Sequence, residues 1–308
     1  MTLQIKGLFH VEGLKEFGYI PTNRYLYSLY LYMNTVKRVT GLYNYAPVNH
    51  LKGYVAHFCY LRLVSFDTFI KVIEQQHDYV SANCLLRMLG DHVAVFRLVY
   101  GEQDEDLLWL RHCLYVIDGC EEGMKVLPTA PINEGCMPEN ELEELAKQNQ
   151  WNREHRQRMM NQAWEILDHL SIKQQDPEAF QKIVDDRNWK FKEFKKYKNI
   201  KDNQYKWKDL YALIGKTEFY DLLSYLSQYA HGLSMSNLII DDKNRQSYDG
   251  VIGEAVGLLD RMNQYVMDFF SEEHDYIMWG LFEPEMRDKI LSCFVEPYRQ
   301  EVAAQWGR

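Results

Sequence analysis

The chain of 308 residues lacks the short motifs that identify many enzymes and membrane proteins. It has no Gly-x-x-x-x-Gly-Lys, Gly-x-Gly-x-x-Gly or Gly-x-Ser-x-Gly stretch, so the common nucleotide-binding and hydrolase signatures are absent. No uninterrupted apolar run reaches about 18 residues, which argues against a transmembrane helix. Charged residues are spread through residues 1–23, which leaves no apolar region for a secretory signal. We therefore expect a soluble, cytoplasmic protein with no membrane partner.

Paired metal-ligand motifs are also missing. The cysteines are scattered and no Cys-x-x-Cys pair occurs, so we expect reduced thiols in an apolar core. Glu74 and His77 have the spacing of a carboxylate-bridged di-iron helix, but the second such pair that this site needs is not found. The sequence therefore predicts no metal site and no cofactor. The six cysteines are Cys59, Cys84, Cys113, Cys120, Cys136 and Cys293.

The chain shows no sustained alternation of apolar and polar residues, so no substantial sheet is expected. A hydrophobic fraction of 46% with 14% aromatic residues excludes general disorder. Apolar spacing and helix-breaking residues predict an all-α fold: a helical bundle with additional long helices. The predicted helices cover residues 22–43, 49–76, 77–100, 104–118, 141–170, 177–186, 206–214, 217–233 and 250–270, followed by short helices bounded by Pro284 and Pro297.

Glycine and proline are concentrated in residues 119–140, which the sequence predicts to be a loop. We expect residues 1–118 to form the N-terminal helical part of the bundle. Residues 119–204 would hold this loop, a protruding helical hairpin and a basic aromatic segment, and residues 205–308 the C-terminal helical part of the same domain. The helix predicted at 141–170 has few apolar anchors, so one of its sides meets solvent or a partner.

Arg87 and Asp91 lie four residues apart in the stretch Leu85-Leu-Arg-Met-Leu-Gly-Asp, so they share a helix face and can pair. The helix is otherwise apolar. The pair is therefore either a buried structural clasp or a preformed site for an anion such as phosphate, which the planar guanidinium can bind with two hydrogen bonds. His92 follows about 100° further round the helix.

A second set of polar residues recurs along one face of a later helix. This set is Tyr220, Ser224, Ser227 and His231. Ser227 and His231 can hydrogen-bond, which would orient the imidazole as a base, and Ser234 follows where the helix end can open to a ligand. A buried hydroxyl without a partner costs roughly 1–3 kcal/mol, so we expect the stripe to meet Arg87 or Asp91. The alternative is that His231 is a core histidine whose hydrogen bonds are made within the protein and that has no role in a site.

Residues 187–208 carry nine lysines and arginines and only two acids, in a chain with a formal net charge of −9. Aromatic residues are interleaved with these cations. Such a pattern is typical of single-stranded nucleic acid binding, where lysines neutralise phosphates and rings stack on bases. The three lysines Lys195, Lys196 and Lys198 are the candidate phosphate contacts. A solvated segment held in place by its aromatic side chains is the alternative.

Two of these motifs resemble a known family. The chain resembles an uncharacterised family of bacterial helical proteins related to HEPN domains. The resemblance lies in the stretch from Leu85 to Asp91 and in the later stretch Tyr225-Leu-Ser-Gln-Tyr-Ala-His-Gly-Leu-Ser, which has the pattern Leu-Ser-x-x-x-His-x-x-Ser. The resemblance covers about residues 50 to 240. It implies a HEPN-like bundle that binds RNA or a nucleotide, a metal-independent ribonuclease of the defence or toxin type, and a homodimer.

Ribonucleases of this family use an arginine separated by four to six residues from a histidine. Arg87 and His92 have this spacing, although Met88 stands where the family usually places a polar residue. His231 lies in the helix that resembles the family's motif helix, but residues 224–226 hold no arginine. The resemblance therefore implies that Arg87 steadies phosphate while His92 or His231 acts as the base.

Asp91, Ser227 and Ser234 would then contribute to binding at the same site. A rival hypothesis comes from a different class of function. In it the protein is a non-enzymatic helical interaction or scaffold protein, the same polar groups form a buried network, and the helix that begins near Glu141 is the partner surface.

Overall fold

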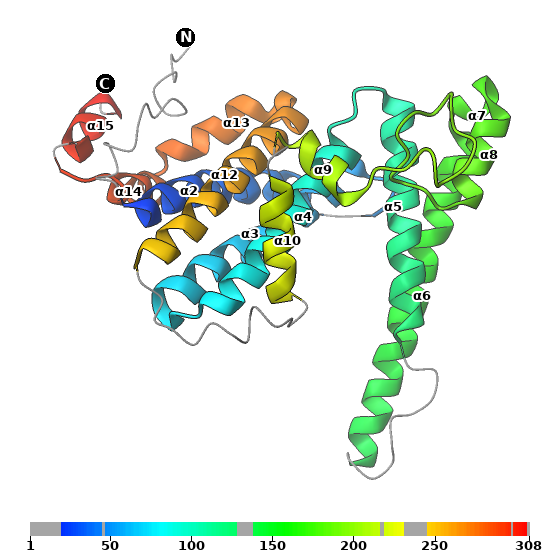
Figure 1. Cartoon of the computed structure of the whole chain (residues 1–308), viewed down its shortest axis with the longest axis horizontal. Coiled ribbons are helices and arrows are strands. Elements are labelled where there is room, and N and C mark those ends of the chain that lie inside the picture. The colour runs from blue at the N-terminus through cyan, green and yellow to red at the C-terminus, as the bar shows by residue number, and fades with distance from the viewer. Residues whose placement is uncertain are drawn as a thin grey trace. The chain divides into compact units, whose positions relative to one another are not determined.

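The computed structural model describes residues 20–44, 47–127, 138–215, 219–230, 245–296 and 298–306. These residues are helical almost throughout (Figure 1). Within these ranges no strand occurs, and a single isolated bridge joins Phe191 to Gln204. The predicted all-α fold is therefore confirmed. None of the helices in the described ranges is long and apolar enough to cross a membrane.

Thirteen α-helices lie within the described ranges. The α-helices are α2 (Pro21–Leu42), α3 (Leu51–Lys71), α4 (Tyr79–Tyr100), α5 (Glu105–Lys125), α6 (Glu139–His169), α7 (Ile172–Gln175), α8 (Pro177–Asp185), α9 (Trp207–Leu213), α10 (Phe219–Ala230), α12 (Arg245–Phe269), α13 (His274–Trp279), α14 (Pro284–Ser292) and α15 (Tyr298–Trp306). A π-helical turn, η2 (Val72–Gln76), and two 3-10 turns, η3 (Ser271–Glu273) and η4 (Gly280–Phe282), complete them.

The chain forms two compact units. Unit 1 is built from the described residues within 1–44, 55–96 and 211–308, and unit 2 from those within 45–54 and 97–210. Residues 97–118, which the sequence assigns to the N-terminal part of the bundle, thus group with the helical hairpin. The division matters for function because the Arg87 motif lies in unit 1 and the basic segment lies in unit 2.

Unit 1 is organised around the tyrosine-rich helix α2. Tyr25 and Tyr32 are fully buried, and their hydroxyl groups donate to the backbone oxygens of Phe66 (2.8 Å) and Cys59 (3.1 Å) in α3. Each buried ring therefore contributes apolar burial without leaving its hydroxyl group unpaired. Helices α12, α13 and α14 also pack against α2. The core of unit 1 is thus assembled from helices at both ends of the sequence.

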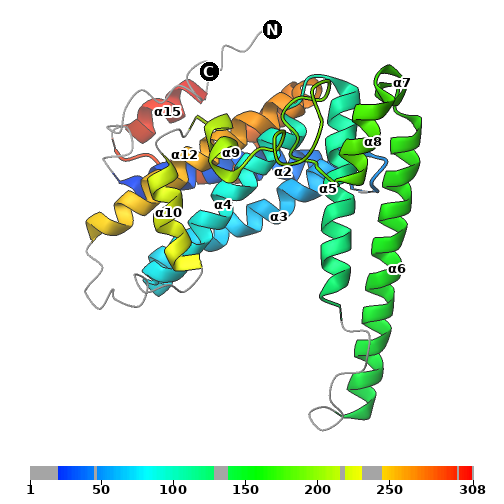
Figure 2. The same ribbon diagram turned by 45° about the vertical axis from the view of Figure 1, so that its right-hand side comes forward.

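Unit 2 contains a long helical hairpin in which α5 packs along α6, as both ribbon views show (Figures 1 and 2). The prediction of a loop at 119–140 is wrong for its first residues, because α5 continues to Lys125. A Cβ added at Gly123 would lie 2.9 Å from Cζ of Arg156, whose Nη1 donates to the Gly123 backbone oxygen at 2.9 Å. Gly123 therefore lets α6 approach α5 closely and does not end the helix.

The cysteines in the described ranges are free thiols. Cys59, Cys113, Cys120 and Cys293 are buried, and Cys84 is half-buried. Burial raises the pKa of Cys113 to about 12, as expected for a thiol that packs as a small apolar group. These cysteines therefore have the environment of core residues and not of reactive thiolates.

Candidate functional site

Arg87 and Asp91 of α4 form the expected pair in unit 1. Arg87 Nη1 donates to Asp91 Oδ1 across one helical turn. Only 14% of the Arg87 side chain and 25% of the Asp91 side chain are exposed. Burial lowers the pKa of Arg87, and the ion pair with Asp91 offsets part of the cost of burying the guanidinium.

Tyr211 of α9 completes this pair and was not predicted from the sequence. Its hydroxyl group accepts a hydrogen bond from Arg87 Nη1 (2.9 Å) and donates one to Asp91 Oδ1 (2.8 Å). Burial raises the pKa of Tyr211 to about 12, so the hydroxyl group keeps the proton that it donates. The Arg87 guanidinium also lies 5.6 Å from the centre of the Tyr211 ring.

Gly90 is what permits Tyr211 to come this close to α4. A Cβ at position 90 would lie only 2.6 Å from the Tyr211 hydroxyl oxygen. A glycine between Arg87 and Asp91, inside a helix, is thus the signal in the sequence that another side chain packs there. It does not say which residue that is.

Ser227 of α10 reaches the same cluster. Arg87 Nε lies 3.5 Å from Ser227 Oγ, at the long limit of a hydrogen bond. The prediction that the polar stripe of the later helix meets Arg87 is confirmed for this serine. The other two residues that the sequence assigned to this helix end, His231 and Ser234, lie outside the described residues.

His92 is directed to a different neighbour. Its Nδ1 lies 2.9 Å from Nη1 of Arg62, and its ring is nearly perpendicular to that of Phe58; both residues belong to α3. Arg87 instead contacts α9 and α10. Burial and the positive charge of Arg62 lower the pKa of His92 to about 3. The structure therefore does not bring His92 to Arg87, although the two residues have the spacing of the family motif.

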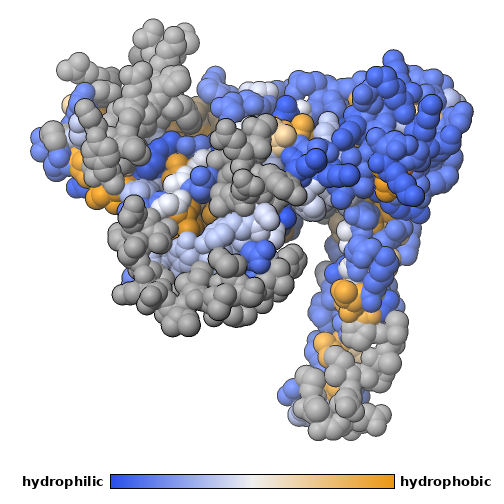
Figure 3. Space-filling model, in the orientation of Figure 1, coloured by the Kyte–Doolittle hydropathy of each residue, from blue (hydrophilic) through white to orange (hydrophobic). Residues whose placement is uncertain are grey.

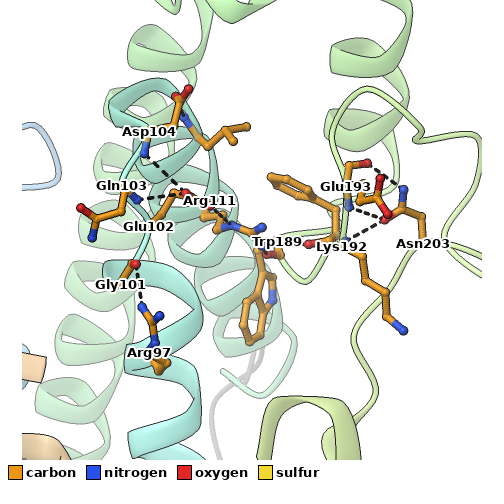
Figure 4. Close-up of polar contacts among 12 residues, drawn as sticks. Arg97, Gly101, Glu102, Gln103, Asp104, Arg111, Trp189, Lys192, Glu193 and Asn203 are labelled. Carbon is orange, nitrogen blue, oxygen red and sulfur yellow. Dashed lines mark hydrogen bonds and ion pairs between the residues drawn. The ribbon is translucent and has the colours of Figure 1, made fainter. Parts of the chain in front are cut away.

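The basic segment of unit 2 is an irregular structure held on α5. Arg111 of α5, with 5% of its side chain exposed, donates to the backbone oxygens of Trp189 (3.2 Å) and Phe191 (2.9 Å) (Figure 4). The Asn203 side chain accepts a hydrogen bond from Glu193 N at 2.8 Å and donates one to the Glu193 backbone oxygen at 2.7 Å. Trp189 Nε1 also donates to Asp118 of α5 at 2.9 Å. Side-chain hydrogen bonds, and not helix formation, hold this segment in place.

The aromatic residues of this segment divide into a buried and an exposed group. The buried rings, which cannot stack on a ligand, are Trp189, Phe191, Phe194 and Tyr197. These four rings therefore do not provide the stacking faces that the interleaved pattern suggested. The visible surface of unit 2 around α7, α8 and this segment is mostly hydrophilic (Figure 3).

The three candidate phosphate contacts of this segment are all exposed. Lys196 pairs with Glu193 at 2.7 Å. Within the described ranges, Lys195 and Lys198 form no ion pair. These two lysines therefore present their charge to solvent, as a phosphate-binding surface requires.

No group of histidine, cysteine, aspartate or glutamate residues in the described part of the chain has an arrangement that could hold a metal ion. No family model, curated protein or solved structure matches this chain.

Proposed function

We propose that this is a HEPN-like RNA-binding protein that cleaves RNA without a metal ion, with Arg87 as the residue that contacts phosphate. The observation that carries the proposal is the meeting of α4, α9 and α10 at Arg87, where Ser227 Oγ lies 3.5 Å from its Nε. In the sequence, Ser227 is four residues before His231, which is the spacing of neighbours on one face of a helix.

His231 suits the role of base better than His92 does. A base that works near neutral pH needs a pKa close to that pH, and the pKa of His92 is lowered to about 3. In the proposed reaction His231 removes the proton of an RNA 2′-hydroxyl, and the 2′-oxygen attacks phosphorus. The bond from phosphorus to the 5′-oxygen then breaks, and that oxygen takes up a proton. The products are a 2′,3′-cyclic phosphate and a 5′-hydroxyl.

Arg87 would stabilise the negative charge that develops on the phosphoryl oxygens. Its guanidinium is suited to this because the pair with Asp91 and Tyr211 fixes its orientation before a ligand binds. Tyr211, protonated and hydrogen-bonded to both partners, acts as a positioning residue.

The experiment is a cleavage assay on single-stranded RNA in EDTA with wild type, His231→Ala and His92→Ala. We expect wild type and His92→Ala to cleave RNA, to leave a 2′,3′-cyclic phosphate and to spare DNA, which has no 2′-hydroxyl. We expect His231→Ala to be inactive. If only His92→Ala lost RNA cleavage, the assignment of His231 as the base would be wrong. If both variants still cleaved RNA, neither histidine would be the base.

The non-enzymatic alternative is favoured by a specific feature of the cluster. Arg87 already has an anionic partner and a hydroxyl partner, and little of its side chain is exposed. Under this alternative the three helices are simply clasped together, and the cluster contributes to stability and not to chemistry. The two possibilities differ in what a conservative change at Arg87 does to the cleavage rate.

A further inference from the structure

Trp207 is an exposed aromatic ring among lysines in unit 2. It is 40% exposed at the first position of α9, and the neighbouring Lys206 and Lys208 are both exposed. The Lys190 ammonium group lies 5.7 Å from the centre of the Trp207 ring and 5.2 Å from that of Trp189. Unlike the four buried rings, Trp207 therefore combines an accessible aromatic surface with adjacent positive charge.

Hydrogen bonds hold the backbone next to this ring. Lys206 N donates to the Asp209 carboxylate at 3.0 Å, which caps the first turn of α9. Tyr205 N donates to the Lys190 backbone oxygen at 2.8 Å. Lys192 pairs with Asp209 at 3.0 Å and lies 5.6 Å from the centre of the Tyr205 ring. A surface that is already ordered loses little conformational entropy when a ligand binds.

We propose that Trp207 stacks on an unpaired base of single-stranded nucleic acid while Lys190, Lys206 and Lys208 contact the phosphates on either side. Stacking on a base requires a flat aromatic surface that solvent can reach, and phosphate contact requires cations beside it. Both are present here, and the exposed Lys195 and Lys198 of the same segment add positive charge.

The ligand is a single strand because a base within a duplex is already stacked on its neighbours. To expose its face, the base would first have to be flipped out of the duplex, which costs free energy. The inference rests on the proposed function only in the choice of RNA as the ligand. It involves none of the residues of the Arg87 cluster, so either can fail without the other.

The test measures the affinity of the full chain for a fluorescent oligouridine by anisotropy. The oligonucleotide carries 2′-O-methyl groups, so the proposed reaction cannot consume it. We expect Trp207→Ala to weaken binding by about 5- to 150-fold, the range for loss of one stacked base. Trp207→Phe, which keeps an aromatic face, should bind nearly as tightly as wild type. Trp207→Leu, which keeps apolar bulk without that face, should bind as weakly as the alanine variant.

Trp279→Ala is the matched control, because Trp279 is 68% exposed and lies in unit 1, outside the basic segment. It should leave the affinity unchanged. Replacing Lys195 and Lys198 by Glu should reduce the dependence of the affinity on salt, whereas Trp207→Ala should not, since a stacked ring releases no counterions. Three results would overturn the proposal. The first is no binding by wild type at low salt, and the second is equal affinity of Trp207→Leu and wild type. The third is a loss of affinity in Trp207→Ala that is as large for duplex RNA as for the single strand. RNA cleavage that proceeds normally in Trp207→Leu would leave the proposed function standing.

Discussion

His112 shows how burial sets the charge state of a single residue in unit 2. Its side chain is fully buried, with Nε2 3.1 Å from the Val48 backbone oxygen and Nδ1 3.4 Å from the Tyr100 hydroxyl group. Burial lowers the pKa of His112 from 6.5 to about 4. The folded protein therefore holds this imidazole in its neutral form at neutral pH.

This shift predicts a loss of stability in acid. In the unfolded chain His112 takes up a proton near pH 6.5, but in the folded protein only near pH 4, so lowering the pH through this window favours unfolding. The contribution of His112, fully present above pH 6.5, should decline by about 3 kcal/mol at most. Urea unfolding at several pH values would measure it. His112→Gln, which can still donate to Val48 but does not titrate, should lose less stability between pH 6.5 and 4; an identical decline in both proteins would refute the prediction.

At the candidate site, the sequence identifies residues that are neighbours on one helix but not those that come from elsewhere. Arg87 and Asp91 could be paired from their spacing, since helical geometry alone brings them together. Tyr211 is 120 residues further along and resembles any core tyrosine in the sequence, so its contact with Asp91 depends on packing between helices. The glycine at position 90 marks the close approach but does not identify the partner.

Among the helices, two starts set by proline were predictable, whereas the end of α5 that was judged from glycine was wrong. The residue Pro177 begins α8 and Pro284 begins α14, where the fixed backbone angle of proline suits the first turn. In contrast α5 runs through Gly119 and Gly123, because packing of α6 compensates for the low helix propensity of glycine there. Local propensity cannot report such a partner helix.

The attachment of the basic segment to α5 gives a prediction at this scale. Arg111→Met would remove the donor to the Trp189 and Phe191 backbone oxygens and the ion-pair partner of Glu102, 3.6 Å away. We expect a loss of about 3 kcal/mol in the free energy of unfolding, the lower end of the cost of breaking a buried ion pair. Amide hydrogen exchange should also become faster in the basic segment.

Lys195→Met is the control for this prediction, because it removes one charge from the exposed surface of the same segment. It should change stability by no more than about 0.5 kcal/mol. If exchange in the segment were the same in Arg111→Met and in wild type, the account of how α5 holds the segment would be wrong.

At the scale of the whole molecule, the charge is unevenly distributed along the chain. The formal net charge is −9, yet residues 187–208 carry nine cations and two acids. General attraction to a polyanion is therefore not expected, and RNA binding, where it occurs, should be confined to the basic segment and to Arg87. The all-α architecture followed from periodicity, but the grouping of residues 97–118 with the hairpin depends on long-range contacts that no local pattern contains.

The role of Arg87 in cleavage is tested by the rate at which Arg87→Lys cleaves RNA. Lysine keeps the positive charge beside Asp91 but loses the planar fork that would hold a phosphoryl group. With RNA in excess and EDTA present, we predict a rate about 100-fold below that of wild type, comparable to the loss of one donor to a developing oxyanion. Circular dichroism would confirm that the variant is folded. Equal rates for Arg87→Lys and wild type, or no cleavage by wild type, would contradict the account and leave the cluster as a structural clasp.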